Sequence, residues 1–187
     1  MRRIIRNYWK IIYSRKFKTM KQLNNGTMKI IGIDPGTATL GWGIIEKIGS
    51  KIKPINYGCV ETSADLAMPE RLFKIFSDLC DIIKIEKPGC AAIEELFFFK
   101  NQKTVIAVAQ ARGVAIVACE SLGIPVFEYT PLQIKQALTG YGRADKNQIQ
   151  VMVKSVCGLA ECPKPDDAAD ALAVAICHSQ TNLNLKP

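Results

Sequence analysis

The chain has 187 residues, enough for one domain and a tail, and a core of that size needs no disulfide or structural metal. Its formal net charge of +8 is typical of nucleic-acid-binding proteins, but the excess lies in residues 1–27, which hold eight Lys and Arg and no acid. The other 17 basic residues are matched by 17 acids, so charge gives no reason to expect that the globular part binds DNA.

The cysteines and the apolar runs exclude further classes of protein. Seven cysteines are scattered along the chain without a Cys-x-x-Cys pair, which argues against a zinc site. Their odd number, with no secretory signal, fits a reducing compartment, and we expect a cytoplasmic protein. No apolar run approaches the roughly 20 residues of a membrane-spanning helix, so we expect no membrane partner.

Residues 1–27 form a basic leader that we expect to lie outside the fold. Apolar residues recur at helical spacing over residues 4–12, with basic residues on the rest of the helical wheel. This pattern is typical of a transit peptide or a membrane-surface helix. We favour a third interpretation, that the leader precedes the native start at Met28. The folded domain is then expected at residues 28–180, with a tail at 181–187.

Hydrophobic periodicity and turn residues predict the elements of this domain. The expected elements in chain order are strands at 30–33, 40–45 and 52–61, a helix at 69–85, a strand at 90–93, a helix at 101–121, a strand at 125–129, and helices at 131–140, 146–157 and 166–178. The first two strands pair as a hairpin, and Pro54 places the third at a sheet edge, because proline cannot donate to a ladder. This order predicts an α/β protein with a mixed sheet and helices on both faces.

Four acids fall at the ends of these elements. Asp34 closes the first strand and Glu94 closes the strand at 90–93, so both emerge at one sheet edge if the two strands are parallel neighbours. Asp167 and Asp170 are three residues apart in the first turn of the last helix, and therefore on one face of it. We expect Asp166 to be the capping acid of that helix, which frees the other two.

Carboxylates gathered in one place repel one another, and a divalent cation relieves that repulsion. Oxygen-only ligands select hard cations, so we expect Mg²⁺, with Mn²⁺ as a substitute and one or two ions per subunit. Such ions activate water and stabilise a leaving oxygen in phosphodiester cleavage. The alternative for each acid taken singly is an ordinary helix-start or turn acid.

Five motifs make the chain similar to the RuvC family of Holliday junction resolvases. They are Ile-Gly-Ile-Asp-Pro-Gly-Thr to Gly-Trp-Gly (31–43), Ala-Ile-Glu-Glu-Leu-Phe (92–97), Gln-Ala-Arg-Gly-Val-Ala-Ile-Val-Ala (110–118), Val-Phe-Glu-Tyr (126–129) and Asp-Ala-Ala-Asp-Ala-Leu-Ala (167–173). The resemblance covers about residues 28–178 and leaves the leader out. It implies an RNase H-like fold and a Mg²⁺-dependent homodimer that cuts two opposed strands of a four-way DNA junction. It also implies the RuvA and RuvB branch-migration complex as a partner.

The resemblance also implies roles for individual residues. The metal-binding acids of the family correspond to Asp34, Glu94, Asp167 and Asp170. We expect metal held on the first three to activate water, and the fourth to complete the metal shell.

Lysines matching Lys135 and Lys146 are needed for activity in the family and contact DNA. Phe97 matches an aromatic residue near the junction centre that could stack on an unpaired base. Lys103 and Arg112 are weaker candidates for phosphate contacts. Surface lysines and a buried phenylalanine are the ordinary alternatives. The Ala- and Gly-rich helix at 101–121 is our candidate for the dimer interface, and His178 is interpreted as incidental.

Three other functions remain open from the residues. The first phosphate loop of actin-type and sugar-kinase phosphotransferases also reads Gly-x-Asp-x-Gly-Thr, but this chain is too short for their second lobe. A non-catalytic junction-binding subunit would not need the four acids. An RNase H-like RNA-processing nuclease is closest in fold, and the Asp-Ala-Ala-Asp pair with Phe97 and Lys146 favours the junction enzyme.

The leader gives the first testable prediction. Deleting residues 1–27 is expected to leave junction cutting largely intact, because the resemblance begins after them. Cutting that collapses at moderate salt after the deletion would show that the leader is a DNA-binding arm.

Overall fold

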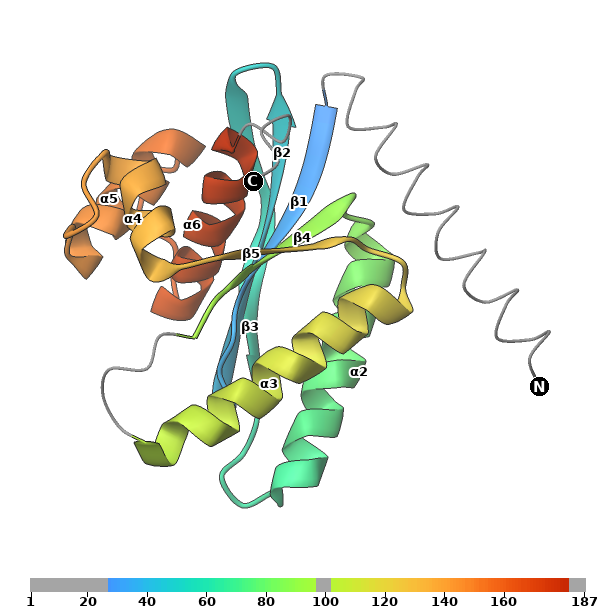
Figure 1. Cartoon of the computed structure of the whole chain (residues 1–187). Helices are drawn as coiled ribbons and strands as arrows, with labels where there is room; N and C mark the ends of the chain where they lie inside the picture. Colours follow the sequence, from blue (N-terminus) through green and yellow to red (C-terminus); the bar gives the residue numbers. More distant parts are fainter. Residues whose placement is uncertain (1–26, 97–101, 182–187) are drawn as a thin grey trace.

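The computed structural model describes residues 27–96 and 102–181, and in these ranges one five-stranded sheet carries helices on both faces (Figure 1). The strands are β1 (Thr27–Asp34), β2 (Thr39–Ile48), β3 (Lys51–Glu61), β4 (Cys90–Glu94) and β5 (Val126–Tyr129). The helices are α2 (Met68–Glu86), α3 (Gln102–Ser121), α4 (Pro131–Thr139), α5 (Lys146–Cys157) and α6 (Asp166–Gln180). The predicted helices agree with these bounds to within two residues. Within the described ranges, no helix combines the length and apolar character needed to cross a bilayer.

The sheet is mixed, as predicted, with the strand order β3-β2-β1-β4-β5. β1 pairs antiparallel with β2, which pairs antiparallel with β3. On its other side β1 pairs in parallel with β4, and β4 pairs in parallel with β5. Pro54 lies in edge strand β3, as its missing N–H requires.

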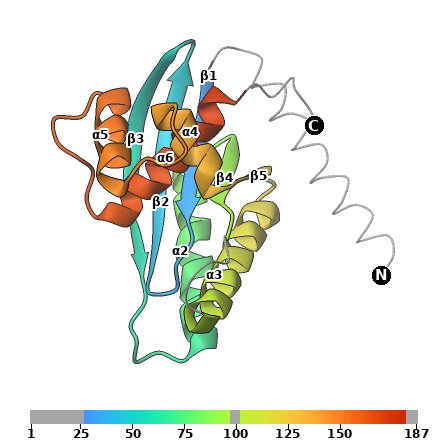
Figure 2. The ribbon, with the colours of Figure 1, turned by 60° about the vertical axis from the view of Figure 1, so that its left-hand side comes forward.

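Each face of the sheet has its own hydrophobic core. Figure 2 shows the helices that cover them, α2 and α3 on one face and α4, α5 and α6 on the other. Ile31 and Ile33 of β1 are fully buried on the face covered by α2 and α3. Ile30 belongs to the core on the opposite face, which α4, α5 and α6 cover. Each fully buried isoleucine contributes about 1.5–3 kcal/mol, so β1 is held firmly from both sides.

Helix α6 lies unusually close to the sheet because three strand positions under it are glycines. A Cβ atom on Gly32 would lie 2.0 Å from the carbonyl oxygen of Ala171, and one on Gly43 would lie 2.7 Å from the Leu172 side chain. The third glycine, Gly41, lies under the start of α6. Glycine in a strand often marks such close backbone approach.

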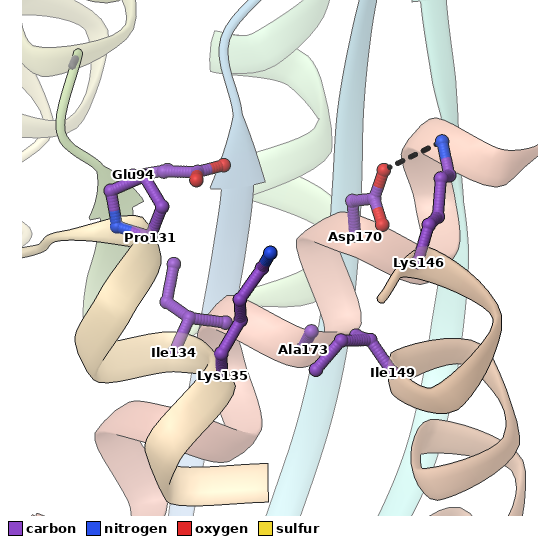
Figure 3. A pocket seen from close by; sticks show the side chains of 8 residues that line it. All are labelled: Glu94, Pro131, Ile134, Lys135, Lys146, Ile149, Asp170 and Ala173. Carbon is purple, nitrogen blue, oxygen red and sulfur yellow. Dashed lines mark ion pairs between the residues drawn. The ribbon is translucent and has the colours of Figure 1, made fainter. Parts of the chain in front are cut away.

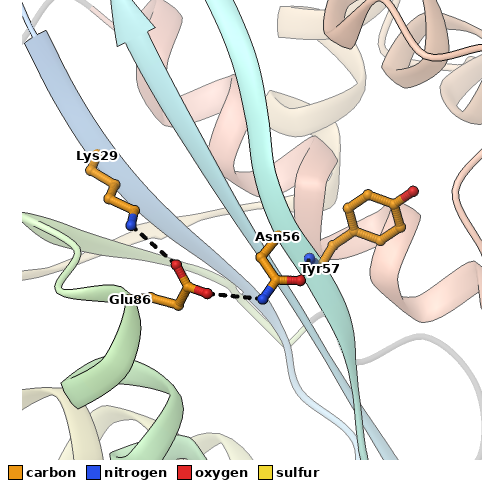
Figure 4. Close-up of polar contacts among 4 residues, drawn as sticks. All are labelled: Lys29, Asn56, Tyr57 and Glu86. Atoms are coloured by element: carbon orange, nitrogen blue, oxygen red, sulfur yellow. Dashed lines mark hydrogen bonds and ion pairs between the residues drawn. The ribbon is translucent and has the colours of Figure 1, made fainter.

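The end of the sheet away from Asp34 is tied together by a polar cluster (Figure 4). Lys29 of β1 forms a 3.1 Å ion pair with Glu86 at the end of α2, and Asn56 of β3 donates a 2.8 Å hydrogen bond to the other oxygen of Glu86. These contacts lower the pKa of Glu86, the Asn56 bond most strongly. The cluster fixes α2 across β1 and β3.

His178, interpreted from the sequence as incidental to function, is a buried residue that is only 1% exposed. Its Nδ1 lies 2.7 Å from the Tyr129 hydroxyl, its Nε2 lies 3.3 Å from the Cys90 sulfur, and its ring packs on Phe127. Burial lowers its pKa to about 4, so the ring stays neutral near pH 7. His178 therefore joins α6 to β4 and β5 as a core residue.

Candidate active site

Two carboxylates meet at the end of the central strands. The pairing of β1 with β4 ends at Ile33 and Ile93, and the next residue of each strand is Asp34 or Glu94. Because the strands are parallel, both acids leave the sheet at the same edge, as predicted. Their carboxyl groups form a hydrogen bond with each other.

Helix α6 brings Asp167 and Asp170 to the same place. Asp34 pairs in the β1–β2 ladder with Gly41, and a Cβ on Gly41 would lie 2.0 Å from the carbonyl oxygen of Asp167. The start of α6 therefore rests directly beside the end of β1. Both helix aspartates raise the pKa of Asp34 through their charge. We call Asp34, Glu94, Asp167 and Asp170 the acid cluster.

The start of α6 differs from the prediction in two details. Asp166 is not the capping residue, because the N-cap position is Pro165, which makes no side-chain cap. Asp166 instead lies in the first helical turn and pairs with Lys146 at 3.4 Å. Asp167 is in that turn, as predicted, whereas Asp170 follows just after it.

Burial and mutual repulsion make full ionisation of the acid cluster unfavourable near pH 7. Burial raises the pKa of Asp34 to about 7, and the charges of Asp170 and Asp167 add to the shift. Burial and the charge of Asp34 raise the pKa of Glu94 to about 8. Burial also raises the pKa of Asp170, although Lys146 opposes the shift. A group of carboxyls that retains protons near pH 7 is a site that favours an added positive charge.

Two lysines border the cluster and line a cleft of about 210 Å³ with Glu94 and Asp170 (Figure 3). Lys146 pairs with Asp170 at 3.1 Å, and the charge of Lys135 counteracts the raised pKa of Glu94. The apolar floor of the cleft comes from four residues between the helices, namely Pro131, Ile134, Ile149 and Ala173.

Well-formed caps set the positions of both lysine-bearing helices. Thr130 accepts a hydrogen bond from the Gln133 amide at the start of α4, as the sequence predicts. Asp145 accepts one from the Gln148 amide at 2.8 Å, which places Lys146 at the first position of α5. The two lysines predicted from the family resemblance thus share the cleft with two of the acids.

The raised pKa values predict how stability depends on pH. In the unfolded chain Asp34 and Glu94 release their protons near 3.8 and 4.5, whereas in the folded protein they keep them until about 7 and 8. Between these limits the folded state binds more protons, so the free energy of unfolding decreases as the pH rises. We expect the metal-free protein to lose at least about 4 °C in Tm between pH 5 and pH 9, measured by thermal unfolding in EDTA. A constant or rising Tm would contradict the shared-proton cluster.

The donor set of the cluster fits a hard dication such as Mg²⁺ or Mn²⁺, because every donor is a carboxylate oxygen. Among the described side chains no three such groups are arranged to hold an ion as they stand. Lys146 now neutralises part of the charge, through its pair with Asp170. Binding of a cation would therefore require Asp170 to exchange Lys146 for the ion.

The remaining predicted residues have different positions. Phe97 lies outside the described residues, and so does the side chain of Lys103, whose backbone is in the first turn of α3. Arg112 of α3 pairs with Glu128 and donates from Nε to the carbonyl oxygen of Glu94 at 3.2 Å. A phosphate contact by Arg112 stays a prediction, but its guanidinium already has two partners in the protein.

One support of the site was not predicted. The loop after Asp34 is fixed by Thr62, whose hydroxyl donates to the Thr37 carbonyl oxygen at 2.5 Å and accepts from Arg71 Nε at 2.8 Å. Thr62 also donates its amide to the carbonyl oxygen of Ala38. The sequence holds no motif for such a contact, because its partners come from separate elements.

Comparisons with known proteins agree with this geometry. The sequence model of the family "Crossover junction endodeoxyribonuclease RuvC" matches residues 30–178. The enzyme of that name from Desulforamulus reducens is 60% identical over 153 residues, which cover 82% of this chain and 94% of the relative.

Solved structures give the same result. The structure of Thermus thermophilus RuvC aligns with a TM-score of 0.76 and 36% identity over 82% of this chain and 94% of that one. The structure of T. thermophilus RuvC in complex with a Holliday junction substrate aligns with a TM-score of 0.75 and 34% identity, with the same coverage. The predicted RNase H-like fold is confirmed.

Proposed function

Because the chain belongs to the RuvC family of crossover junction endodeoxyribonucleases, it is a nuclease that resolves Holliday junctions, and we propose that cutting takes place at the acid cluster with Mg²⁺ as the cofactor. The phosphotransferase and RNA-processing alternatives have no comparable support. The finer assignments, which concern the metal, the residue roles and the subunit arrangement, are supported by the geometry of the described residues and by the family resemblance.

The single observation that carries the metal proposal is the shared position of four carboxylates from β1, β4 and α6. Asp34 lies at its centre, since it hydrogen-bonds Glu94 and is affected by both helix aspartates. A bound Mg²⁺ would supply an activated water and charge stabilisation for the leaving oxygen. Asp34, Glu94 and Asp167 are the proposed holding ligands, and Asp170 completes the set.

The two lysines are proposed to act on the DNA. A cation bound to Asp170 would take the place of Lys146 there and leave its ammonium paired with Asp166 alone among the acids of α6, from where it could neutralise a phosphate near the scissile bond. Lys135, across the same cleft, is placed to contact the backbone of the cut strand. We further propose Phe97 for stacking at the junction centre and Lys103 for a phosphate contact.

The test of the proposed function is a cleavage assay on a synthetic mobile four-way junction, with the nicks mapped at nucleotide resolution. We expect paired nicks at symmetric positions of two opposed strands with Mg²⁺ or Mn²⁺, and none in EDTA. A linear duplex of the same sequence is the matched control and should stay intact. Equal cutting of duplex and junction, or cutting in EDTA, would contradict the proposal.

We also propose that the chain acts as a homodimer through α2 and α3, because cutting two opposed strands needs two sites related by a twofold axis. Ala111, Ala115 and Ala118 of α3 are fully buried in the core that α3 shares with the sheet. The outer side of α3 forms an apolar groove with α2, lined by Leu72, Phe73, Phe76, Gln110, Gly113, Val114 and Val117. An exposed apolar groove of this kind fits a second copy of the chain. Partnership with a RuvA and RuvB complex is proposed from family membership alone.

Breaking this surface is expected to produce a monomer. Phe73 is 70% exposed in the described chain, so Phe73→Glu should leave folding intact but place a charge in the groove. We expect half the mass in light scattering, and nicks that lose their pairing on opposed strands. Ile85→Glu is the control, because Ile85 is equally exposed on α2 but does not line the groove. A dimeric Phe73→Glu would exclude this interface.

A further inference from the structure

Arg112 makes contacts that a surface arginine does not usually make. It lies on α3, on the opposite face of the sheet from α6, and its side chain is only 20% exposed. Its terminal nitrogen pairs with the Glu128 carboxylate of β5, and its Nε donates to the Glu94 carbonyl oxygen. One planar guanidinium therefore joins the last residue of β4 to the neighbouring strand.

The backbone carbonyl of Glu94 lies just beyond the last residue pair of the β1–β4 ladder. The pairing of β4 with β1 ends at Ile33 and Ile93, and β1 continues from Asp34 into Pro35. Proline has no N–H, so Pro35 cannot extend the ladder to Glu94. On the β5 side, the Glu95 amide bonds to Tyr129, which leaves the carbonyl of Glu94 to Arg112.

We propose that Arg112 is a positioning residue that holds the backbone of Glu94 so that its carboxyl group stays aligned with Asp34. The carboxyl group of Glu94 lines the cleft on the α6 side, and the guanidinium holds the same residue from the α3 side. Partners that orient a ligand in this indirect way typically contribute tenfold or more to metal affinity. The inference rests on the proposed metal site of the acid cluster.

The test measures Mn²⁺ binding to the whole protein without DNA, from the free-ion signal in electron paramagnetic resonance. We expect Arg112→Gln to weaken Mn²⁺ binding about tenfold, and Arg112→Lys to weaken it less, because lysine reaches one of the two acceptors but not both. Glu128→Gln should also weaken it, since the guanidinium loses its charged anchor. Lys84→Gln is the control for loss of charge, because Lys84 forms its ion pair with exposed Asp81 on α2, away from the acid cluster.

Junction binding in EDTA separates this role from a direct DNA contact. A positioning role leaves the affinity for the junction, and its salt dependence, unchanged in all three variants. A phosphate contact predicts instead that Arg112→Gln reduces the slope of log affinity for the junction against log salt concentration by about one. It also predicts that Glu128→Gln tightens junction binding, because a nearby acid is removed.

The outcomes also separate the inference from the proposed function. If the wild-type protein binds no Mn²⁺, the metal site itself is refuted. If the wild type binds Mn²⁺ and the Arg112 and Glu128 variants bind it equally well, the positioning role is overturned. If Arg112→Gln does not fold, which the absence of a cooperative unfolding transition would show, the Mn²⁺ affinities of Arg112→Lys and Glu128→Gln are compared with the wild type instead. Equal affinities in those two variants overturn the positioning role.

Discussion

Asp34→Asn is expected to reduce junction cutting by about 10³-fold, which corresponds to roughly 4 kcal/mol of lost transition-state stabilisation. Asp34 interacts with each of the other acids, through a hydrogen bond to Glu94 and through the charges of the two helix aspartates. An amide keeps the shape of the side chain but removes the charge that would hold the metal. The measurement is the single-turnover nicking rate on a four-way junction in Mg²⁺.

Junction binding and stability should respond differently from cutting. We expect the affinity for the junction in EDTA to stay within about threefold, because DNA contacts are spread over the proposed dimer. Above pH 7 the metal-free variant should be at least as stable as the wild type, because the ionised Asp34 is buried among other acids. Asp65→Asn, at an exposed loop acid, is the control and should cut normally. Loss of binding equal to the loss of cutting would contradict the assignment.

The strand-end acids were predictable because their positions follow from local patterns. A buried apolar run that ends in an acid, as at Asp34 and at the Glu94-Glu95 pair, indicates a strand end in any sheet arrangement. The parallel pairing of β1 with β4 then makes the two acids neighbours. The start of α4 was equally clear, since Thr130 and Pro131 are a cap and a first position by type alone, whereas the cap of α6 was predicted wrongly.

Contacts between distant elements were not predictable in the same way. The sequence shows that His178 is a single histidine near a helix end, but only the packing of α6 on β4 and β5 makes it a core residue. Arg112 was chosen as a phosphate contact from its charge, and its two protein partners come from separate strands. The glycines of β1 and β2 did carry a signal, because buried strands seldom tolerate glycine without a close neighbour.

Those glycines lead to the second large effect, which is expected for Gly41→Ala. The added Cβ would lie 2.0 Å from the carbonyl oxygen of Asp167 and 2.5 Å from its carbonyl carbon, and both are backbone atoms. A normal contact needs more than 3 Å, so the start of α6 must move by about 1 Å. A misplacement of that size typically costs about 100-fold in rate. We expect that loss in junction cutting, with a decrease of about 1–3 kcal/mol in the free energy of unfolding.

The comparison that isolates this effect is Gly58→Ala on the adjacent strand β3. Its added Cβ would lie 3.3 Å from a ring carbon of Trp42, a side chain that can shift slightly, and its three nearest neighbours are all atoms of that ring. Gly58→Ala should therefore cut at nearly the wild-type rate. If Gly41→Ala also does so while remaining folded, α6 does not depend on Gly41 for its position. Asp167 would then reach Asp34 by flexibility of the helix start, and the close packing of α6 would serve stability alone.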